Sequence, residues 1–223
     1  MTRKIILILG VIAVIAGAFW LDIAQSQPRS NNAGGSTQTS NQTSSKKSRT
    51  AVSQGDQTLI VFFSRSGTNY PHANLKHGHT YAVAKEIAQK TKGTRYEIIP
   101  QKAYPKDYEK TVDQAQEEQN ENARPQIKHP IPDLTKYKTV FIGYPIWWDD
   151  IPMPVRTFMD QANLNGKTVI PFSTNAGSGW EDSLSTLHKK YPKAHFRKGF
   201  EIEGTEVNHA TSKIDSWLQK LGY

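Results

Sequence analysis

The stretch TVFIGYPIWW, residues 139–148, begins as an apolar run of β-branched and aromatic residues and breaks at Pro145. Such a run, bounded by Gly and Pro, is typical of a strand that is buried on both faces of a parallel sheet. Trp147 and Trp148 follow the break. Because open α/β sheets bind ligands beyond the carboxyl ends of their strands, the two indoles either offer stacking surfaces for a flat ring or serve as ordinary packing aromatics.

Two other predicted strands end in small polar loops. Leu59–Phe63 is followed by SRSGTN, residues 64–69, and Thr168–Phe172 is followed by STNAGSG, residues 173–179. The carboxyl ends of parallel strands lie at one edge of a sheet, so the three loops are expected to meet there. We therefore expect a single ligand site, formed by these two loops and the tryptophans.

Strands and helices alternate over the second part of the chain. Strands are expected at 59–63, 95–99, 168–172 and 195–202 and from Thr139 to the break at Pro145. Apolar residues at steps of three and four predict helices at 80–91, from Pro154 onward, at 181–191 and at 207–221, and a polar helix is expected at 108–122. Residues 124–138 contain three prolines and are expected to form a loop. This alternation predicts an α/β fold with a doubly wound parallel sheet.

Composition excludes several classes of function. The chain has 223 residues and no cysteine, which rules out disulfides, thiolate catalysis and cysteine-ligated metals. Its formal charge is +8, but residues 1–50 hold six Lys/Arg and one acid, so the remainder has 22 basic and 19 acidic residues. No nucleic-acid partner is expected from so small an excess. His72, His77 and His79 lack carboxylate or cysteine partners at ligand spacing, so no metal is expected either.

Three segments of the chain differ in composition. Residues 1–24 are apolar after Arg3 and Lys4, which is typical of an export signal or a membrane anchor. Residues 25–57 are polar and lack aromatics, so we expect a disordered linker, and residues 58–223 are expected to be the folded domain. A retained anchor places this domain at the extracytoplasmic face of the membrane, whereas cleavage after the small residues at 16–18 would make it a secreted protein.

Four of these segments together resemble the flavodoxin family. They are FFSRSG (62–67), GHT (78–80), YPIWW (144–148) and TNAGSG (174–179), and the resemblance covers about residues 58–221. The tryptophan segment and its continuation IPMPVRTF (151–158) are the most specific part. The resemblance implies a five-stranded parallel sheet in the order 2-1-3-4-5 with helices on both faces, and FMN as the cofactor.

The resemblance also implies which residues hold FMN. Hydroxyls and the amino terminus of a helix suit its phosphate, and this end of the site is assigned to Ser64, Arg65, Ser66, Gly78, His79 and Thr80. The ring is assigned to Pro145, Ile146, Trp147, Trp148, Thr174, Asn175, Ala176, Gly177 and Gly179. An insertion, Thr68 to His77, splits the usual phosphate loop. Asp149 and Asp150 either disfavour the anionic reduced ring or are solvated loop acids.

No catalytic acid, base or metal site is evident, and simple electron transfer needs none. We expect an exported, membrane-tethered FMN protein that passes electrons to a redox partner protein or to a small-molecule acceptor. One alternative is an FMN-dependent NAD(P)H:quinone or small-molecule reductase, so whether the protein is an enzyme stays open. A second alternative is a surface binding module that has lost the flavin, since the folded part is nearly neutral and its phosphate loop is split.

Overall fold

The computed structural model describes residues 53–71 and 73–223. The expected anchor at 1–24 and most of the expected linker lie outside the described residues. Within the described part, none of the helices has the length and apolar character needed to cross a bilayer. The last three residues of the expected linker, Gly55–Gln57, form a 3-10 helix, η1. Gly55 is buried against Lys92, and the amide of Lys138 donates to the carbonyl of Gln57 at 2.9 Å, so η1 packs on the domain.

The core of the fold is a parallel sheet. Its strands are β4 (Thr94–Glu97), β1 (Thr58–Phe62), β5 (Thr139–Pro145), β6 (Thr168–Asn175), β7 (His195–Phe196) and β8 (Phe200–Glu203). They pair in the order β4-β1-β5-β6-β7, and β8 also pairs with β6. With β7 and β8 counted as one broken strand, this is the order 2-1-3-4-5, so the predicted doubly wound sheet is confirmed.

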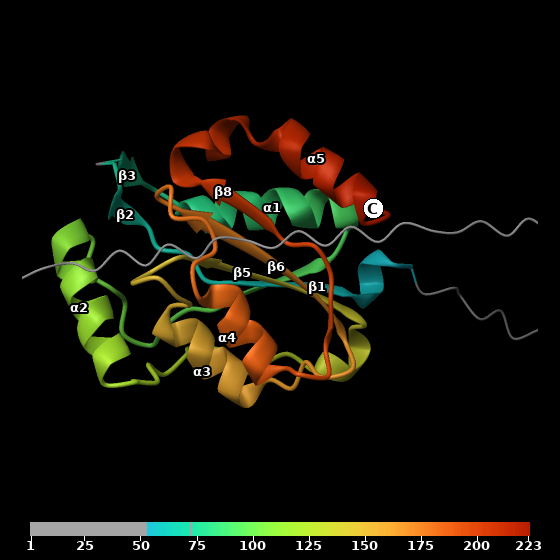
Figure 1. Cartoon of the computed structure of the whole chain (residues 1–223), viewed down its shortest axis with the longest axis horizontal. Coiled ribbons are helices and arrows are strands. Elements are labelled where there is room, and N and C mark those ends of the chain that lie inside the picture. Colours follow the sequence, from blue (N-terminus) through green and yellow to red (C-terminus); the bar gives the residue numbers. More distant parts are fainter. Residues whose placement is uncertain (1–52, 72) are drawn as a thin grey trace, which may run out of the picture. The chain divides into compact units, whose positions relative to one another are not determined.

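Helices cover both faces of this sheet (Figure 1). One apolar layer joins the sheet to α1 (His79–Thr91) and α5 (Thr211–Lys220), and the other joins it to α3 (Met153–Gln161) and α4 (Ser183–Lys190). Residues on β1 alternate between the layers, with Ile60 in the first and Val61 in the second. Short 3-10 helices are η2 (Leu134–Lys136) and η3 (Gly204–His209), and η3 replaces the predicted start of the terminal helix.

The helix α2 (Tyr108–Asn120) lies outside these two layers, at the end of the sheet where the small strands β2 and β3 also lie (Figure 1). Only Thr111 and Ala115 of this helix are buried. The strands β2 (Gly67–Asn69) and β3 (Ala73–Leu75) form an antiparallel hairpin within the predicted insertion. The insertion and α2 therefore flank the same end of the fold.

The fifth strand differs from its prediction as one strand at 195–202. Phe196 pairs with Val169 and Phe200 with Phe172, so the outer strand has one more residue than β6 between these pairs. The reason is Pro171, which lies between the two paired segments of β6. The Val169 carbonyl points to the outer strand, where it accepts from the amide of Arg197 at 3.0 Å. Pro171, two residues later on β6, points to the same outer strand but has no N–H to donate. The strand therefore bulges at 197–199.

A glycine at the centre of β5 makes room for an aromatic ring. Gly143 pairs with Phe172 on β6, and a Cβ at position 143 would lie 2.0 Å from the Phe172 ring. Phe172 is completely buried. Gly143 is thus required by packing, because a ring from the neighbouring strand fills the space where its side chain would be.

Gly143→Ala is expected to lower the free energy of unfolding by about 3 kcal/mol, because the added methyl group overlaps a buried ring and the core has to shift. Gly166→Ala is the control. Gly166 has φ +78° and open space around it, so only backbone strain of about 1 kcal/mol is expected. Urea unfolding of the full-length proteins measures both values. Equal losses in the two variants would contradict the proposed overlap.

Candidate functional site

The three predicted loops meet at the carboxyl edge of the sheet, around a cavity of about 110 Å³. Eleven of the residues that the sequence assigned to the site line it: Ser64, Arg65, Gly78, His79, Thr80, Pro145, Ile146, Trp147, Thr174, Asn175 and Ala176. The hydroxyls and the start of α1 are at one end and the first tryptophan is at the other. The structure therefore brings together most of the predicted site.

A second cavity of about 280 Å³ adjoins the first, since both are lined by Arg65, Asn69, Tyr108, Ile146 and Trp147. Its remaining walls are Trp148, Asp149 and three residues of α2, namely Thr111, Val112 and Ala115. The first cavity thus reaches the first turn of α1, and the second is bounded by α2.

Polar groups are close together where α1 begins. The Ser64 hydroxyl accepts from the amide of Tyr81 at 3.1 Å, and the hydroxyls of Thr80 and Thr174 are 2.8 Å apart. Gly78 precedes the helix, and a Cβ there would lie 2.4 Å from both the Arg65 carbonyl and the Ser64 hydroxyl. The backbone can approach this closely only because Gly78 has no side chain.

His79 is the first residue of α1 and is half-buried in the wall of the smaller cavity. Its Nε2 atom is buried and has no hydrogen-bond partner among the described residues. Burial lowers the pKa of this imidazole, so it is neutral at pH 7. A Cβ at Gly204 would lie 2.8 Å from the ring, so η3 packs directly against it. His79 therefore lines the cavity as a neutral ring, with its Nε2 atom packed toward Gly204.

Arg65 is held by backbone carbonyls. Its guanidinium donates to the carbonyls of Ser66, Thr68, Pro105 and Lys106, the Pro105 bond being 2.9 Å. Burial lowers its pKa, and the neighbouring Asp107 and Tyr108 act in the opposite direction. Arg65 lines the cavities, but its hydrogen bonds tie the first loop to residues 105–106. Ser66 lines neither cavity, and its hydroxyl accepts from Lys106.

The two tryptophans have different surroundings. Trp147 is half-buried, packs edge-on against Phe63 at 5.3 Å and Tyr104 at 5.1 Å between ring centroids, and lines both cavities. Trp148 is 41 % exposed, lines only the larger cavity, and donates its indole N–H to the Val112 carbonyl of α2 at 3.0 Å. Trp147 is thus an inner wall and Trp148 an outer wall.

Asp149 and Asp150 differ as well. Asp149 lines the larger cavity. The Asp150 carboxylate is only 14 % exposed and lines neither cavity, because it forms an ion pair with Arg156 at 2.5 Å and accepts from Thr186 at 2.9 Å. For Asp150, the interpretation as a solvated loop acid is therefore wrong, because its carboxylate is shielded and paired with Arg156.

The loop after β6 is held by Asn175, whose side-chain oxygen accepts from the amide of Gly177 at 2.8 Å. Gly177 and Gly179 have φ values of +97° and +73°, which favour glycine. Neither glycine lines a cavity, although both were predicted to be site residues. Sequence reasoning also missed Asn69, Tyr70, Tyr108 and Gly204 in the smaller cavity. Asn69 belongs to the first polar loop that the sequence indicated, and Tyr70 was signalled only by the insertion.

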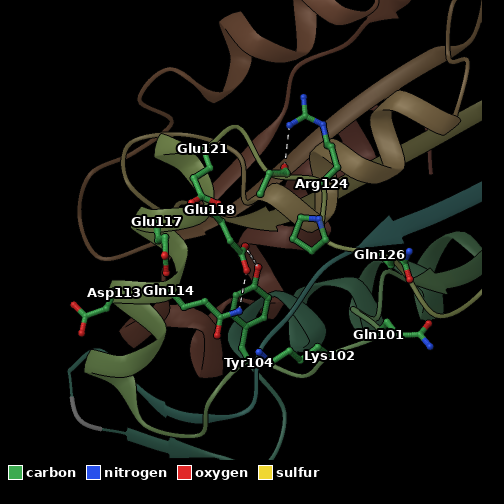
Figure 2. Close-up of a pocket in the computed structure, with 12 residues that line it drawn as sticks. Gln101, Lys102, Tyr104, Asp113, Gln114, Glu117, Glu118, Glu121, Arg124 and Gln126 are labelled. Carbon is green, nitrogen blue, oxygen red and sulfur yellow. Dashed lines mark hydrogen bonds between the residues drawn. The ribbon is translucent and has the colours of Figure 1, made fainter.

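A third hollow, of about 760 Å³, lies between α2 and residues 101–104 and 123–126 (Figure 2). Figure 2 shows Gln114 and Tyr104 both hydrogen-bonded to Glu118. Burial and the nearby carboxylate raise the pKa of Tyr104, so its hydroxyl keeps its proton at pH 7. The ring of Tyr104 separates this acidic hollow from Trp147. In the described residues, no three His, Cys, Asp or Glu side chains gather in a way that could hold a metal ion.

Known structures share this architecture. A protein of Bacteroides uniformis ATCC 8492, provisionally described as a flavoprotein, is 30% identical, with a TM-score of 0.61 over 74% of this chain and 99% of that one. A similarly described protein of Bacteroides eggerthii DSM 20697 is 30% identical and has a TM-score of 0.55, and the match covers 71% of this chain and 98% of that one. A flavoprotein of Lactobacillus acidophilus NCFM, crystallised in complex with FMN, has 22% identity and a TM-score of 0.52, and the match covers 69% of this chain and 97% of that one.

A comparison with curated proteins gave no match. The family model for flavodoxin, however, matches residues 57–221, which is almost the whole described part of the chain. The order of the strands and the meeting of the three loops agree with that match. This chain belongs to the flavodoxin family.

Proposed function

We propose that this protein binds FMN at the carboxyl edge of its sheet and passes electrons through it. The observation that carries the proposal is the pair of adjoining cavities, with hydroxyls and a helix amino terminus at one end and indoles at the other. These are the groups that an anionic phosphate and a flat aromatic ring require. The FMN complex of the Lactobacillus acidophilus flavoprotein supports the choice of flavin.

The phosphate end fits an anion in both shape and polarity. The first turn of α1, a helix of 13 residues, directs its positive dipole end toward the cavity. Ser64 and Thr80 add hydroxyls, and Gly78 leaves the space that a side chain would fill. Arg65 adds positive charge at the cavity wall, while its Nη1 and Nη2 atoms donate to backbone carbonyls.

The other end of the space fits a flat ring. Trp147 is fixed by two edge-on aromatic neighbours, and Ile146 lines both cavities beside it. Trp148 is held to α2 by its indole hydrogen bond. A ring between these side chains gains stacking and apolar contacts with walls that are already in place.

Bound FMN supplies the redox chemistry, since it takes up and releases one or two electrons. The protein has to bind the flavin, orient it and exclude water from part of its surface. No side chain has to transfer a proton. Tyr104, the buried hydroxyl behind Trp147, is protonated and hydrogen-bonded to Glu118.

FMN is expected to bind the full-length protein at one molecule per chain and to quench its tryptophan fluorescence. Trp148→Ala should weaken binding about tenfold, because a stacking contact and its buried area are lost. Trp217→Phe is the control, since Trp217 packs in the apolar layer of α1 and α5, away from both cavities. Absence of FMN binding at high micromolar concentration would refute the flavin proposal and favour the surface binding module.

Electron transfer is separated from reductase activity by the electron donor. A carrier is expected to oxidise NADH or NADPH no faster than free FMN does, yet to be reduced rapidly by a flavodoxin reductase. Absorbance at 340 nm, followed with and without a quinone acceptor, measures the first rate, and flavin bleaching measures the second. Steady turnover with a nicotinamide donor would instead identify an enzyme of the reductase type.

We further propose that the domain works at the extracytoplasmic face of the membrane, held by residues 1–24. The support is the sequence alone: an apolar run after Arg3 and Lys4, followed by a polar segment. The partner is then a redox protein or small molecule of that compartment. The full-length protein is expected in the membrane fraction and accessible to protease from outside the cell. A variant without residues 2–24 should stay in the cytoplasm, and equal distribution of the two would refute the anchor.

A further inference from the structure

The turn that carries the tryptophans has an unusual backbone. Trp148 and Asp149 are its two central residues, with φ values of +46° and +62°. The turn is closed by reciprocal hydrogen bonds between Trp147 and Asp150, of 3.0 and 3.1 Å. Two positive φ values make it a type I′ turn, in which Gly, Asn and Asp predominate, so Trp148 is its unusual residue. For a side chain such as tryptophan, this conformation is disfavoured by a factor of roughly 5 to 30.

Neighbouring elements hold the carbonyls of this turn. The Trp148 carbonyl accepts from the Gln119 side chain of α2 at 2.8 Å, and the Asp149 carbonyl accepts from the amide of Asp182 at 2.9 Å. The turn is thus tied to α2 on one side and to the start of α4 on the other. Such contacts can keep a backbone in a conformation that its own residues disfavour.

Asp150 makes the strongest of these attachments. One carboxylate oxygen accepts from the amide of Ile151 at 2.7 Å, and the other accepts from Arg156 at 2.5 Å and Thr186 at 2.9 Å. The ion pair is shielded, since the Arg156 and Asp150 side chains are 23 % and 14 % exposed. Charge-assisted hydrogen bonds of this kind are stronger than neutral ones. Asp150 therefore fixes the end of the turn to α3 and α4.

We propose that Asp150 is a positioning residue, which holds the turn in its left-handed conformation and so places Trp148 and Asp149 at the wall of the cavity. Asp150 itself does not touch the cavity, so it acts through the backbone. The inference rests on the proposed FMN site. The affinity for FMN then depends on how completely the ligand-free turn is held in this conformation.

The test uses the conformational freedom of glycine. Asp150→Ala in the full-length protein should weaken FMN binding about tenfold, since the turn loses its anchor and leaves the left-handed conformation. Adding Asp149→Gly should restore the affinity to within about threefold, because glycine adopts positive φ without a steric penalty. Adding Asp149→Ala removes the same carboxylate without that freedom, so the affinity should stay low.

Two controls separate positioning from general stability. Asp160→Ala also removes an aspartate with two ion pairs, to Arg124 and Lys190, but at the carboxyl end of α3 and in the lining of neither cavity, and should keep wild-type affinity. Asp150→Asn replaces Asp150→Ala if that variant does not fold, because it keeps the shape of the side chain while losing the charge that pairs with Arg156. Wild-type affinity in the Asp150 variants, or rescue by Asp149→Ala as good as by Asp149→Gly, would overturn the proposal.

A ligand-free measurement separates this inference from the FMN proposal. The Trp148 indole N–H donates to Val112, so its hydrogen exchange by NMR reports whether the turn is in place. Exchange should become at least tenfold faster in Asp150→Ala and return toward the wild-type rate with Asp149→Gly. If wild-type protein binds no FMN but the exchange follows this pattern, the positioning role stands and the flavin proposal fails. Unchanged exchange in Asp150→Ala would overturn the positioning role.

Discussion

The pairing of β5 between β1 and β6 is the constraint on which the rest of the structure depends. These strands run parallel and in register, with Gly143 beside Phe62 on one side and Phe172 on the other. Their carboxyl ends therefore reach the same edge, and the loops that follow must meet there. The site is a consequence of this pairing, since each loop supplies one part of it. The loop after β1 supplies a hydroxyl, the loop after β5 an indole, and the end of β6 the residues 174–176.

Away from the apolar layers, buried charges hold the walls of the site. The Arg65 guanidinium donates to four carbonyls, and the Asp150 carboxylate accepts from three donors. A buried charge is tolerable only if its hydrogen-bonding capacity is met. Both side chains therefore stabilise particular backbone paths, which short loops with few apolar residues could not maintain by packing alone.

Hydrophobic pattern was enough to predict the sheet, its flanking helices and the meeting of the three loops, because these features follow from local periodicity and strand direction. It predicted α2 as a polar helix but could not place that helix in the fold, because only Thr111 and Ala115 of α2 are buried. It also missed the break between β7 and β8, because that break depends on whether Pro171 of β6 points to the outer strand or to β5. The roles of Arg65 and Asp150 depend on partners up to 41 residues away, so their sequence neighbourhood carried no signal.

The position of α2 has a consequence for the energetics of the site. The helix buries little, and it is joined to the turn of the tryptophans through Gln119 and Val112. The turn, in a disfavoured conformation, depends in part on the same bonds. Each element thus stabilises the other, and only Trp147, at the start of the turn, packs against an apolar layer. The outer wall of the larger cavity therefore depends on hydrogen bonds more than on apolar burial, and a ligand that contacts both elements stabilises them together.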